Sequence, residues 1–357
     1  MKKICFFLGD VHGAGGISRV TWIIANKLCS QYGVYILAAF RNPVTKYKYR
    51  DGVWVDYLFD TRMSVHKRLF SLIKRIRNYI QKNKIEVLIC AGEIYYIPCA
   101  LALMGLKTKL VCWEHSNVSV QDEHKFQNIC RRVGARCADE IVTLTQTDCE
   151  MYKKKYGVTN CQYIYNPVDD RLINDVHYQH DSRKVISVGR LCYQKNFNEM
   201  IEIAKEILPK HPEWHWDVYG DGEEREALQR KIDEYNLSGQ LTLKGNVANL
   251  YELYRDYSFL VMTSRFEGFP MTLLESTAQG IPAIAYDVLT GPNEIIVDGK
   301  NGYLIPNGNR SQMIEKIEKL IAHRQVRMDM SKSCVNIRSC FECQRIIDQW
   351  IALLDRL

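Results

Sequence analysis

The stretch SFLVMTSRFEGFPMTLLES, residues 258–276, passes from a strand pattern to a helix pattern through one short turn. Its first seven residues, SFLVMTS, have the pattern of a strand with an apolar centre. Pro270 then suits the first position of a helix that runs to about Gln279, and Gly280 follows as a C-terminal stop. A buried strand that leads through a turn into a helix is the unit from which parallel α/β sheets are built.

The same alternation continues along the whole chain of 357 residues. Further β-rich runs are KICFFLG, VYILAA, VWVDYL, EVLICA, KLVCW, EIVTL and CQYIY in the first half, and KVISVG, HWDVYG, LTLKG and IPAIAY in the second. Apolar runs of this length between helical patterns predict a parallel sheet with helices on both faces. Two such series predict an α/β protein with two Rossmann-like domains.

We expect an N-terminal domain over residues 1–168 and a C-terminal domain over 169–340. A C-terminal helix over 341–357 is expected to pack back on the first domain. The break falls in the stretch 166–183, which is polar and has no sustained period. Ligands of such sheets bind beyond the carboxyl ends of the strands, so two facing domains would hold a ligand in the cleft between them.

Composition is that of a soluble globular protein, with 46% hydrophobic and 25% charged residues. The net charge of +7 is distributed unevenly, since residues 1–170 carry +10 and the remainder carries −3. A basic first half beside a nearly neutral second half indicates an anionic partner for the first half.

The run of residues 87–106, VLICAGEIYYIPCALALMGL, approaches membrane-spanning length and carries one charge, Glu93. Gly92, Glu93 and Pro98 interrupt it, which favours a buried strand over 86–91 followed by a helix. A spanning helix is the alternative. The first residues, MKKICFFLGDVHGAGG, read as a short strand that runs into glycines and are not typical of a signal peptide.

Thirteen cysteines are scattered along the chain, and an odd number cannot all pair within it. This usage is typical of reduced, cytosolic cysteine that serves as a small apolar residue. Cys340 and Cys343 form a lone CxxC, and no second pair completes a zinc site.

Two glutamates in the opening stretch are candidate ligand-binding residues. Glu267 lies in the turn at the carboxyl end of the strand, and Glu275 lies one to two turns inside the helix. The helix N-terminus, with the amides of Met271 and Thr272, carries partial positive charge and can hold a phosphate. A diphosphate flanked by two polyols, as in a nucleotide sugar, fits this order. The alternative is a solvated turn acid and an ordinary helix-surface glutamate.

A second strand end supplies two cations. SVGRLCYQKN places Arg190 and Lys195 after a strand, where they can neutralise a pyrophosphate, Arg190 by a planar fork and Lys195 as a point charge. The alternative is ordinary surface charge.

Glycines mark two further strand ends. Gly220 and Gly222 in VYGDGEER permit a tight turn, and Gly15 and Gly16 in GDVHGAGGISRV let a backbone approach a ligand before a helix begins. The latter loop is not a GxGxxG fingerprint, because its last position is Ser18, and it is not a P-loop.

Together these segments resemble a retaining glycosyltransferase of the GT-B fold, family 4, of the type that builds bacterial surface polysaccharides and lipid-linked oligosaccharides. The resembling segments are GGISRV, WEHSN, NPVD, VGRLCYQKN, SRFEGFPMTLLES and TGPNEIIVDGKNGYLI, which follow the family's order over residues 15–305. The chain departs from the family pattern at Pro167 and at Pro270, where many members have glycine.

The resemblance implies a role for each matching residue. Glu267 would contact the donor sugar, Glu275 the ribose, and Arg190 and Lys195 the pyrophosphate of the leaving nucleoside diphosphate. His115 would lie near the reacting face of the sugar; a helix-capping or buried structural histidine is the alternative. The implied catalytic set is Glu267, His115, Arg190 and Lys195, and the implied donor-binding set is Gly15, Gly16, Arg190, Lys195, Asn246, Val247, Glu267, Gly268, Phe269, Met271, Thr272 and Glu275.

The sequence holds no DxD triplet and no His/Asp/Glu cluster with metal-ligand spacing. We therefore expect no metal or other cofactor besides the nucleotide-sugar donor, for which a UDP-sugar is expected. Arg190, Lys195 and the helix N-terminus would take the role of a divalent cation. The family implies front-face displacement, in which the leaving phosphate helps to deprotonate the acceptor hydroxyl.

Residues 61–85, TRMSVHKRLFSLIKRIRNYIQKNKI, hold eight Lys or Arg and no acid. Apolar residues recur at helical spacing, which predicts a basic amphipathic helix whose apolar stripe packs on the first domain's sheet. The candidate membrane and acceptor residues are Lys67, Arg68, Lys74, Arg75 and Arg77. RRVGAR at 131–136 and KKK at 153–155 add to the same charge. At an anionic membrane each basic side chain contributes about 1 kcal/mol.

We thus expect a cytoplasmic enzyme, peripherally attached to the inner face of the cell membrane, that glycosylates a polyprenyl-diphosphate-linked glycan. One alternative is a GT-B-type nucleotide-sugar epimerase, which needs no lipid acceptor. A second is a non-enzymatic module that binds membrane or nucleic acid; no nucleic-acid partner is expected, because the basic half lacks interleaved stacking aromatics.

Overall fold

The computed structural model describes residues 1–13, 15–44, 47–62, 65–118, 125–173, 178–247 and 250–357. The chain divides into unit 1, Met1–Pro167 with Cys343–Leu357, and unit 2, Val168–Glu342. The boundary between the two units, after Pro167, falls within the polar stretch 166–183 in which the break was expected. Residues 174–177 of that stretch lie outside the described part. The last helix, α13 (Cys343–Arg356), belongs to unit 1.

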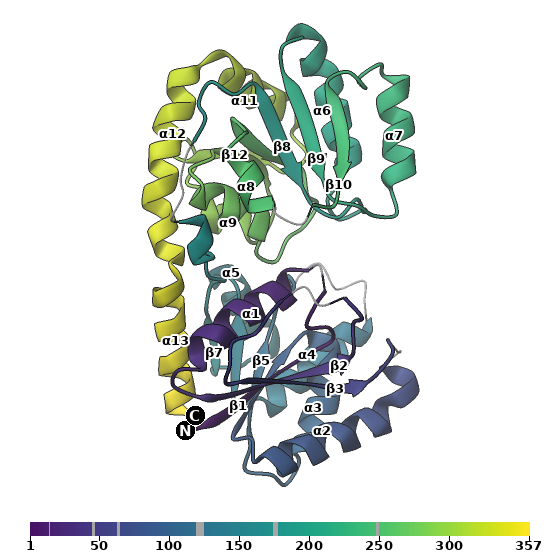
Figure 1. Cartoon of the computed structure of the whole chain (residues 1–357), viewed down its shortest axis with the longest axis vertical. Coiled ribbons are helices and arrows are strands. Elements are labelled where there is room, and N and C mark those ends of the chain that lie inside the picture. The colour runs from purple at the N-terminus through teal and green to yellow at the C-terminus, as the bar shows by residue number, and fades with distance from the viewer. Residues whose placement is uncertain (14, 45–46, 63–64, 119–124, 174–177, 248–249) are drawn as a thin grey trace. The chain divides into compact units, whose positions relative to one another are not determined.

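Unit 1 is built on a seven-stranded parallel sheet with the order β3-β2-β1-β4-β5-β6-β7 (Figure 1). Its strands are β1 (Lys3–Leu8), β2 (Gly33–Phe40), β3 (Val53–Phe59), β4 (Val87–Ala91), β5 (Lys109–Trp113), β6 (Glu140–Thr143) and β7 (Cys161–Tyr163). Its helices are α1 (Gly16–Leu28), α2 (Leu69–Asn83), α3 (Tyr96–Leu103), α4 (Lys125–Cys137), α5 (Gln146–Tyr156) and α13.

Helices cover both faces of this sheet, because successive side chains of a strand point to opposite faces. Phe7 faces the side of α2 and α3, where it packs edge-on against Tyr95 at 5.2 Å between ring centroids. Phe6 faces the other side, where it meets Trp113 and Trp350, the latter from α13. Figure 1 shows the two chain ends side by side here, where Lys2 Nζ donates to the carbonyl of Leu354 (2.6 Å).

Unit 2 is built on a six-stranded parallel sheet with the order β10-β9-β8-β11-β12-β13. Its strands are β8 (Lys184–Val188), β9 (His215–Tyr219), β10 (Leu241–Gly245), β11 (Phe259–Met262), β12 (Ala283–Asp287) and β13 (Gly302–Pro306). Its helices are α6 (Phe197–Ile207), α7 (Arg225–Glu234), α8 (Leu250–Tyr254), α9 (Met271–Ala278), α10 (Pro292–Ile295), α11 (Arg310–Ala322) and α12 (Arg324–Ile337). The apolar faces of α6, α7 and α11 share one core cluster with the sheet.

Every strand predicted from the sequence is present, and the prediction of two parallel-sheet, Rossmann-like domains is confirmed. The prediction missed β13, which pairs with β12 over five residues at the edge of the second sheet. Its run GYLIP begins with glycine and ends with proline, two residues that are depleted in strands, so it lacks the continuous apolar character of the central strands.

The run of residues 87–106 forms β4 and α3, so the strand-then-helix prediction is confirmed and the spanning-helix alternative is wrong. In the part of the chain that the structure describes, no helix has the length and apolar character needed to cross a bilayer.

Both sheets reverse their strand order once, between β1 and β4 in unit 1 and between β8 and β11 in unit 2. Ligands of open parallel sheets bind at the carboxyl edge beside such a reversal, because the connections leave in opposite directions and expose a crevice. In unit 2 the reversal lies between the paired strands β8 and β11. The loop after β8 carries Lys195, and the loop after β11 carries Glu267.

Candidate functional site

The loops after β8 and β11 are bonded to each other at this reversal. The amide of Arg265 donates to the carbonyl of Gln194 (2.8 Å), and Gln194 Nε2 donates to the carbonyl of Phe266 (3.0 Å). The hydroxyl of Thr263 donates to the carbonyl of Asn196 (3.2 Å). The two loops therefore form one frame, which fixes the side chains that they carry.

Lys195 and Glu267 form an ion pair on this frame, with 2.6 Å between Nζ and Oε1. Glu267 is 5% exposed, and the Lys195 methylenes lie over Gly189, where a Cβ would meet them at 3.1 Å. Because a buried carboxylate is costly unless it is paired, the ion pair with Lys195 holds the Glu267 side chain in one position. A fixed cation beside a fixed carboxylate suits a ligand that presents a phosphate next to hydroxyl groups.

The turn of Glu267 is held from its other side by residues to which the sequence analysis gave no role. The Thr290 hydroxyl donates to the Glu267 carbonyl (2.7 Å). Gly291 has φ +98°, and a Cβ there would lie 2.6 Å from Pro270 Cδ and 2.9 Å from the carbonyl oxygen of Gly268. The sequence signal was the TGPNE motif, which was noted for the resemblance only.

Helix α9 follows this turn. Pro270 is the residue before the helix, with ψ 100°, so the prediction that it takes the first helical position is wrong by one residue. Met271 and Thr272 are the first two helical residues, and N-terminal amides carry partial positive charge. The Phe269 ring is buried against Phe341 at 5.8 Å, which leaves the backbone of Phe269 as its means of contacting a ligand.

Glu275 is the fifth residue of α9 and is 1% exposed, so the alternative of an ordinary helix-surface glutamate is wrong. The hydroxyl of Tyr254, at the end of α8, donates to Glu275 Oε2 (3.0 Å). Sequence reasoning missed Tyr254, because nothing in the spacing of two separate helices indicates this contact. The ribose role of Glu275 stays a prediction.

Arg190 is exposed and pairs with Glu223 at 3.0 Å. The structure therefore brings Lys195 to Glu267, whereas Arg190 contacts the loop after β9. That loop contains Gly220, with φ +135°, whose Cβ would lie 1.8 Å from the carbonyl oxygen of Gly189. Position 220 therefore requires glycine for two reasons: the two loops approach each other closely, and the turn has a positive φ.

Asn246 and Val247 are exposed directly after β10. The amide of Gly220 donates to the carbonyl of Gly245 (2.9 Å), which places this strand end beside the loop after β9. The predicted base contacts follow β10 and the predicted pyrophosphate contacts follow β8, so they lie at the same edge of the sheet with β9 between them.

Unit 1 holds the two remaining parts of the predicted site. Gly15 is the residue before α1 and is exposed, and Gly16 begins the helix. His115 follows β5, with its ring 4.2 Å from the Trp113 ring between centroids. The ring is half-buried, and its Nε2 atom is buried without a hydrogen-bond partner among the described residues. Burial lowers the pKa of His115 to about 3, so the imidazole is neutral at physiological pH.

A buried ion pair between Arg131 and Glu114 anchors the segment of His115, whereas the sequence analysis counted Arg131 with the surface charge. Arg131 Nε and Nη2 donate to the two carboxylate oxygens of Glu114 at 2.7 and 2.9 Å. Glu114 Oε1 also accepts from the amide of Ser116 (3.2 Å). Arg131 is fully buried, so its inclusion in the basic surface through RRVGAR is wrong, while Arg132 and Arg136 are exposed.

The basic helix is present as α2, preceded by a short turn, and its apolar stripe packs in the core of unit 1 through Leu72, Ile76 and Ile80, which confirms that prediction. Lys67, Arg68 and Lys74 are exposed.

Arg75 and Arg77 have structural contacts that charge counting could not show. Arg75 Nη1 donates to the carbonyl of Leu58 (2.5 Å), and Arg77 Nη1 donates to the carbonyl of Met104 (2.7 Å). The exposed lysines of α2 thus remain available to a partner, whereas these two arginines also tie the helix to its neighbours.

Two family models match the chain in succession. The model described as Glycosyltransferase Family 4 matches residues 14–172, and the model described as Glycosyl transferases group 1 matches residues 169–334.

Curated relatives match over nearly the full length. The amylovoran biosynthesis glycosyltransferase AmsD of Erwinia amylovora is 29% identical over 99% of this chain and 100% of its own. A Campylobacter jejuni N-acetylgalactosaminyltransferase, whose name gives an undecaprenol-diphosphate-linked trisaccharide as its substrate, is 26% identical over 99% of this chain and 98% of its own.

Among solved structures, a variant of Staphylococcus aureus TarM in complex with fondaparinux, α-GlcNAc-glycerol and UDP superimposes with a TM-score of 0.83 at 17% identity. The match covers 99% of both chains and shows a common fold.

Proposed function

The chain is a GT-B glycosyltransferase of bacterial polysaccharide synthesis, and from that premise we propose that it moves a hexose or N-acetylhexosamine from a UDP-sugar to a polyprenyl-diphosphate-linked glycan. The observation that carries the donor half is the Lys195–Glu267 pair at the strand-order reversal of unit 2. Glu267 accepts hydrogen bonds from the sugar hydroxyls, and Lys195 lies beside the phosphates. UDP is proposed because the TarM structure, which shares the fold, contains it.

The chemistry that we propose is transfer with retention and without a metal ion. The acceptor hydroxyl oxygen forms a bond to the anomeric carbon on the face from which the diphosphate departs. The bond from that carbon to the diphosphate oxygen breaks, and the hydroxyl proton passes to the departing phosphate. Lys195, Arg190 and the N-terminus of α9 stabilise the negative charge of the nucleoside diphosphate. His115, neutral at physiological pH, contacts the sugar through a hydrogen bond and not as a cation.

The acceptor half rests on α2. Phe70 is 86% exposed, and the lysines one turn before and after it, Lys67 and Lys74, are exposed as well. An exposed ring between cations suits an anionic membrane surface, where the ring enters the interface and the cations meet the headgroups. A polyprenyl chain is a lipid anchor, so an acceptor that carries one lies at a membrane; the name of the Campylobacter relative gives an acceptor of this kind for that enzyme.

Turnover of nucleotide sugars tests the proposal. The purified protein is incubated with a panel of UDP- and GDP-sugars and EDTA, with and without a membrane lipid extract, and the released nucleoside diphosphate is measured. We expect release with one or a few UDP-sugars when lipid is present, and a loss of about 10²- to 10³-fold in Glu267→Gln. Glu226→Gln, an exposed glutamate on α7, is the matched control and is expected to behave as the wild type.

Each part of the proposal has its own contrary result. Activity abolished by EDTA would contradict metal independence, and a product with inverted anomeric configuration by NMR would contradict retention. Conversion of the donor sugar without any acceptor would favour an epimerase. Unchanged donor affinity in Glu267→Gln would remove Glu267 from the donor site.

A further inference from the structure

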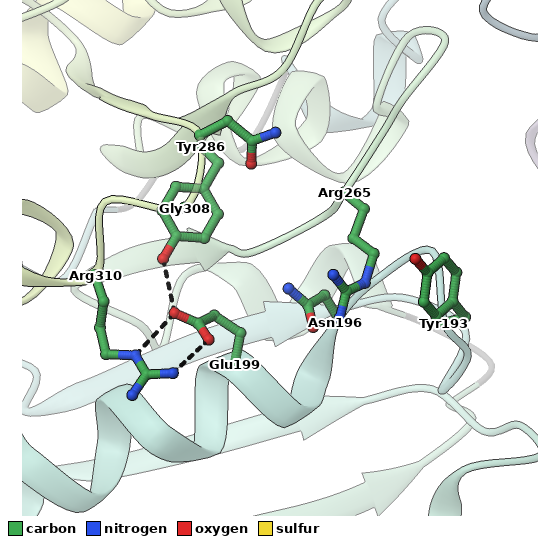
Figure 2. Close-up of a pocket in the computed structure, with 8 residues that line it drawn as sticks. Tyr193, Asn196, Glu199, Arg265, Tyr286, Gly308 and Arg310 are labelled. Atoms are coloured by element: carbon green, nitrogen blue, oxygen red, sulfur yellow. Dashed lines mark hydrogen bonds and ion pairs between the residues drawn. The ribbon is translucent and has the colours of Figure 1, made fainter.

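A cavity of about 580 Å³ opens in unit 2 beside the donor loops and is lined by residues other than Lys195 and Glu267 (Figure 2). Its walls come from the starts of α6 and α11, from the loops after β8 and β11, and from the end of β12. This volume lies within the range of about 300–1,000 Å³ that is usual for ligand pockets.

One wall of the cavity is a fixed network around Glu199, in the first turn of α6. Arg310 donates to both oxygens of Glu199, from Nε at 2.9 Å and from Nη2 at 2.7 Å, and the Tyr286 hydroxyl donates to Oε1 at 3.1 Å (Figure 2). The hydrogen bonds from Arg310 lower the pKa of Glu199, so the carboxylate stays ionised. The network holds the guanidinium of Arg310 at the cavity in one orientation.

The opposite wall carries a second arginine. Arg265 Nη2 donates to Asn196 Oδ1 (2.8 Å), and the guanidinium lies 4.5 Å from the centre of the Tyr193 ring. Figure 2 shows Arg265, Asn196 and Tyr193 together on one side, with Glu199, Arg310 and Tyr286 on the other. Tyr193 is 66% exposed, although aromatic rings of this size are usually largely buried.

The lining indicates the chemistry of a ligand. Among the described residues that line the cavity, every side chain is polar or aromatic, so the cavity offers hydrogen-bonding groups and rings to a ligand and no aliphatic surface. The lining holds two arginines and one glutamate; Arg310 is paired with Glu199 and lies 4.0 Å from Glu202, so the positive charge of the lining is centred on Arg265. Planar amide and guanidinium groups donate to hydroxyl and anionic oxygens, and a tyrosine ring offers its negative face to the C–H groups of a sugar.

We propose that this cavity is a second ligand site, which binds an anionic saccharide, that is, a sugar unit bearing a carboxylate or a phosphate. The charge of the sugar pairs with Arg265 and Arg310, its hydroxyls bond to Asn196 and Asn307, and one face of its ring packs on Tyr193. The site is separate from the proposed donor site, although Asn196 follows Lys195 directly in the sequence. The inference rests on the cavity itself and holds whether or not the transfer reaction is as proposed.

Calorimetric titration of the full chain tests this site with four probes: glucuronic acid, glucose 6-phosphate, glucose and inorganic phosphate. We expect both anionic sugars to bind at least tenfold more tightly than glucose and inorganic phosphate. Arg265→Gln is expected to weaken the binding of the anionic sugars about tenfold, in line with the loss of one charged hydrogen bond. Arg230→Gln, an exposed arginine on α7, is the matched control and should bind as the wild type.

Further variants separate this site from the donor loops. Tyr193→Ala should weaken the binding of the anionic sugars and leave the binding of inorganic phosphate unchanged, since a bare anion does not pack on the ring. Glu267→Gln should leave the binding of anionic sugars unchanged. Glucose binding as tightly as glucuronic acid, inorganic phosphate binding as tightly as glucose 6-phosphate, or no binding of any probe would overturn the proposal. Loss of binding in Glu267→Gln with retention in Arg265→Gln would also overturn it.

Discussion

Glu267 and Lys195 depend on each other at the scale of single residues. A carboxylate that is almost entirely buried would cost several kcal/mol without a partner, and Lys195 supplies one at 2.6 Å. The pair is therefore set before any substrate arrives, so little reorganisation remains to be done when a sugar binds.

His115 allows a prediction of pH dependence. Folding lowers the pKa of His115 to about 3, from an ordinary value of about 6.5, so the unfolded chain binds the proton more tightly. Stability is therefore lost as the pH falls below about 6.5, by up to about 1.4 kcal/mol per pH unit until the folded pKa is reached. In urea unfolding between pH 6 and 4, His115→Asn should lose less stability than the wild type.

The control for this prediction is His215→Asn, which changes an exposed histidine of unit 2. Because this side chain is exposed, its replacement should not reproduce the smaller loss of stability that is expected for His115→Asn. Parallel pH curves for wild type and His115→Asn would contradict the lowered pKa.

At the scale of elements, a substitution at Gly220 tests how closely the loops after β8 and β9 must approach each other. A Cβ at Gly220 would meet the carbonyl oxygen of Gly189 at 1.8 Å, and the residue has φ +135°. Gly220→Ala should therefore destabilise unit 2 by about 3 kcal/mol or more, as strained backbone substitutions do, and weaken donor binding. Thermal unfolding and UDP titration measure the two effects.

Gly239→Ala is the matched variant, because a Cβ there meets nothing within 4 Å. It should change the unfolding midpoint little. Equal midpoints for the two alanine variants would show that the loops separate at no cost.

Helix α2 gives a second prediction at this scale. Lys67→Glu together with Lys74→Glu should reduce flotation with anionic liposomes at least tenfold, because each exposed cation contributes about 1 kcal/mol. Arg75 and Arg77 are left unchanged, since both hold backbone carbonyls. Flotation is measured at low and at physiological salt.

The control pair is Lys300→Glu with Lys332→Glu, two exposed lysines of unit 2. This variant has the same change of net charge and should float as the wild type does. If both double variants lose flotation equally, overall charge and not α2 governs attachment.

How much the sequence predicts differs between elements. Strands with continuous apolar runs, such as β1 and β11, were found because burial on both faces imposes that pattern. The edge strand β13 was missed because its run GYLIP is bounded by glycine and proline and has only three apolar residues between them. The positions of Lys195 and Glu267 after two strands could be predicted from the local order of the sequence, whereas their roles stay predictions.

Contacts between segments that lie far apart in the chain could not be predicted from the sequence. The pairs Tyr254–Glu275 and Arg131–Glu114 join residues 21 and 17 positions apart on separate elements. No local spacing encodes such a pair, because its geometry arises from the packing of whole helices and strands. For the same reason, counting Arg131 as surface charge was wrong.

At the scale of the whole molecule, Trp350 shows what α13 contributes to unit 1. The ring is fully buried and packs against Trp113 at 5.0 Å and Phe6 at 6.3 Å between centroids. Trp350→Ala should destabilise unit 1 by about 3–5 kcal/mol through cavity formation. Calorimetry should show the transition of unit 1 at lower temperature, with that of unit 2 unchanged.

Trp54→Ala provides the comparison. This tryptophan is 50% exposed and stacks on Tyr35 in β2, so its loss should cost much less than that of Trp350. A common shift of both transitions in Trp350→Ala would show that the two units unfold as one.

The membership of α13 in unit 1 also determines when the protein can finish folding. About 175 residues of unit 2 are synthesised between the two segments of unit 1. At a translation rate of about 5–20 residues per second, the first segment waits roughly 10–35 s before Trp350 leaves the ribosome. During that interval unit 2 can complete its own core, whereas Phe6 and Trp113 of unit 1 lack their contact with the Trp350 ring. Phe6, among the earliest residues made, thus completes its packing only when the last helix has been synthesised.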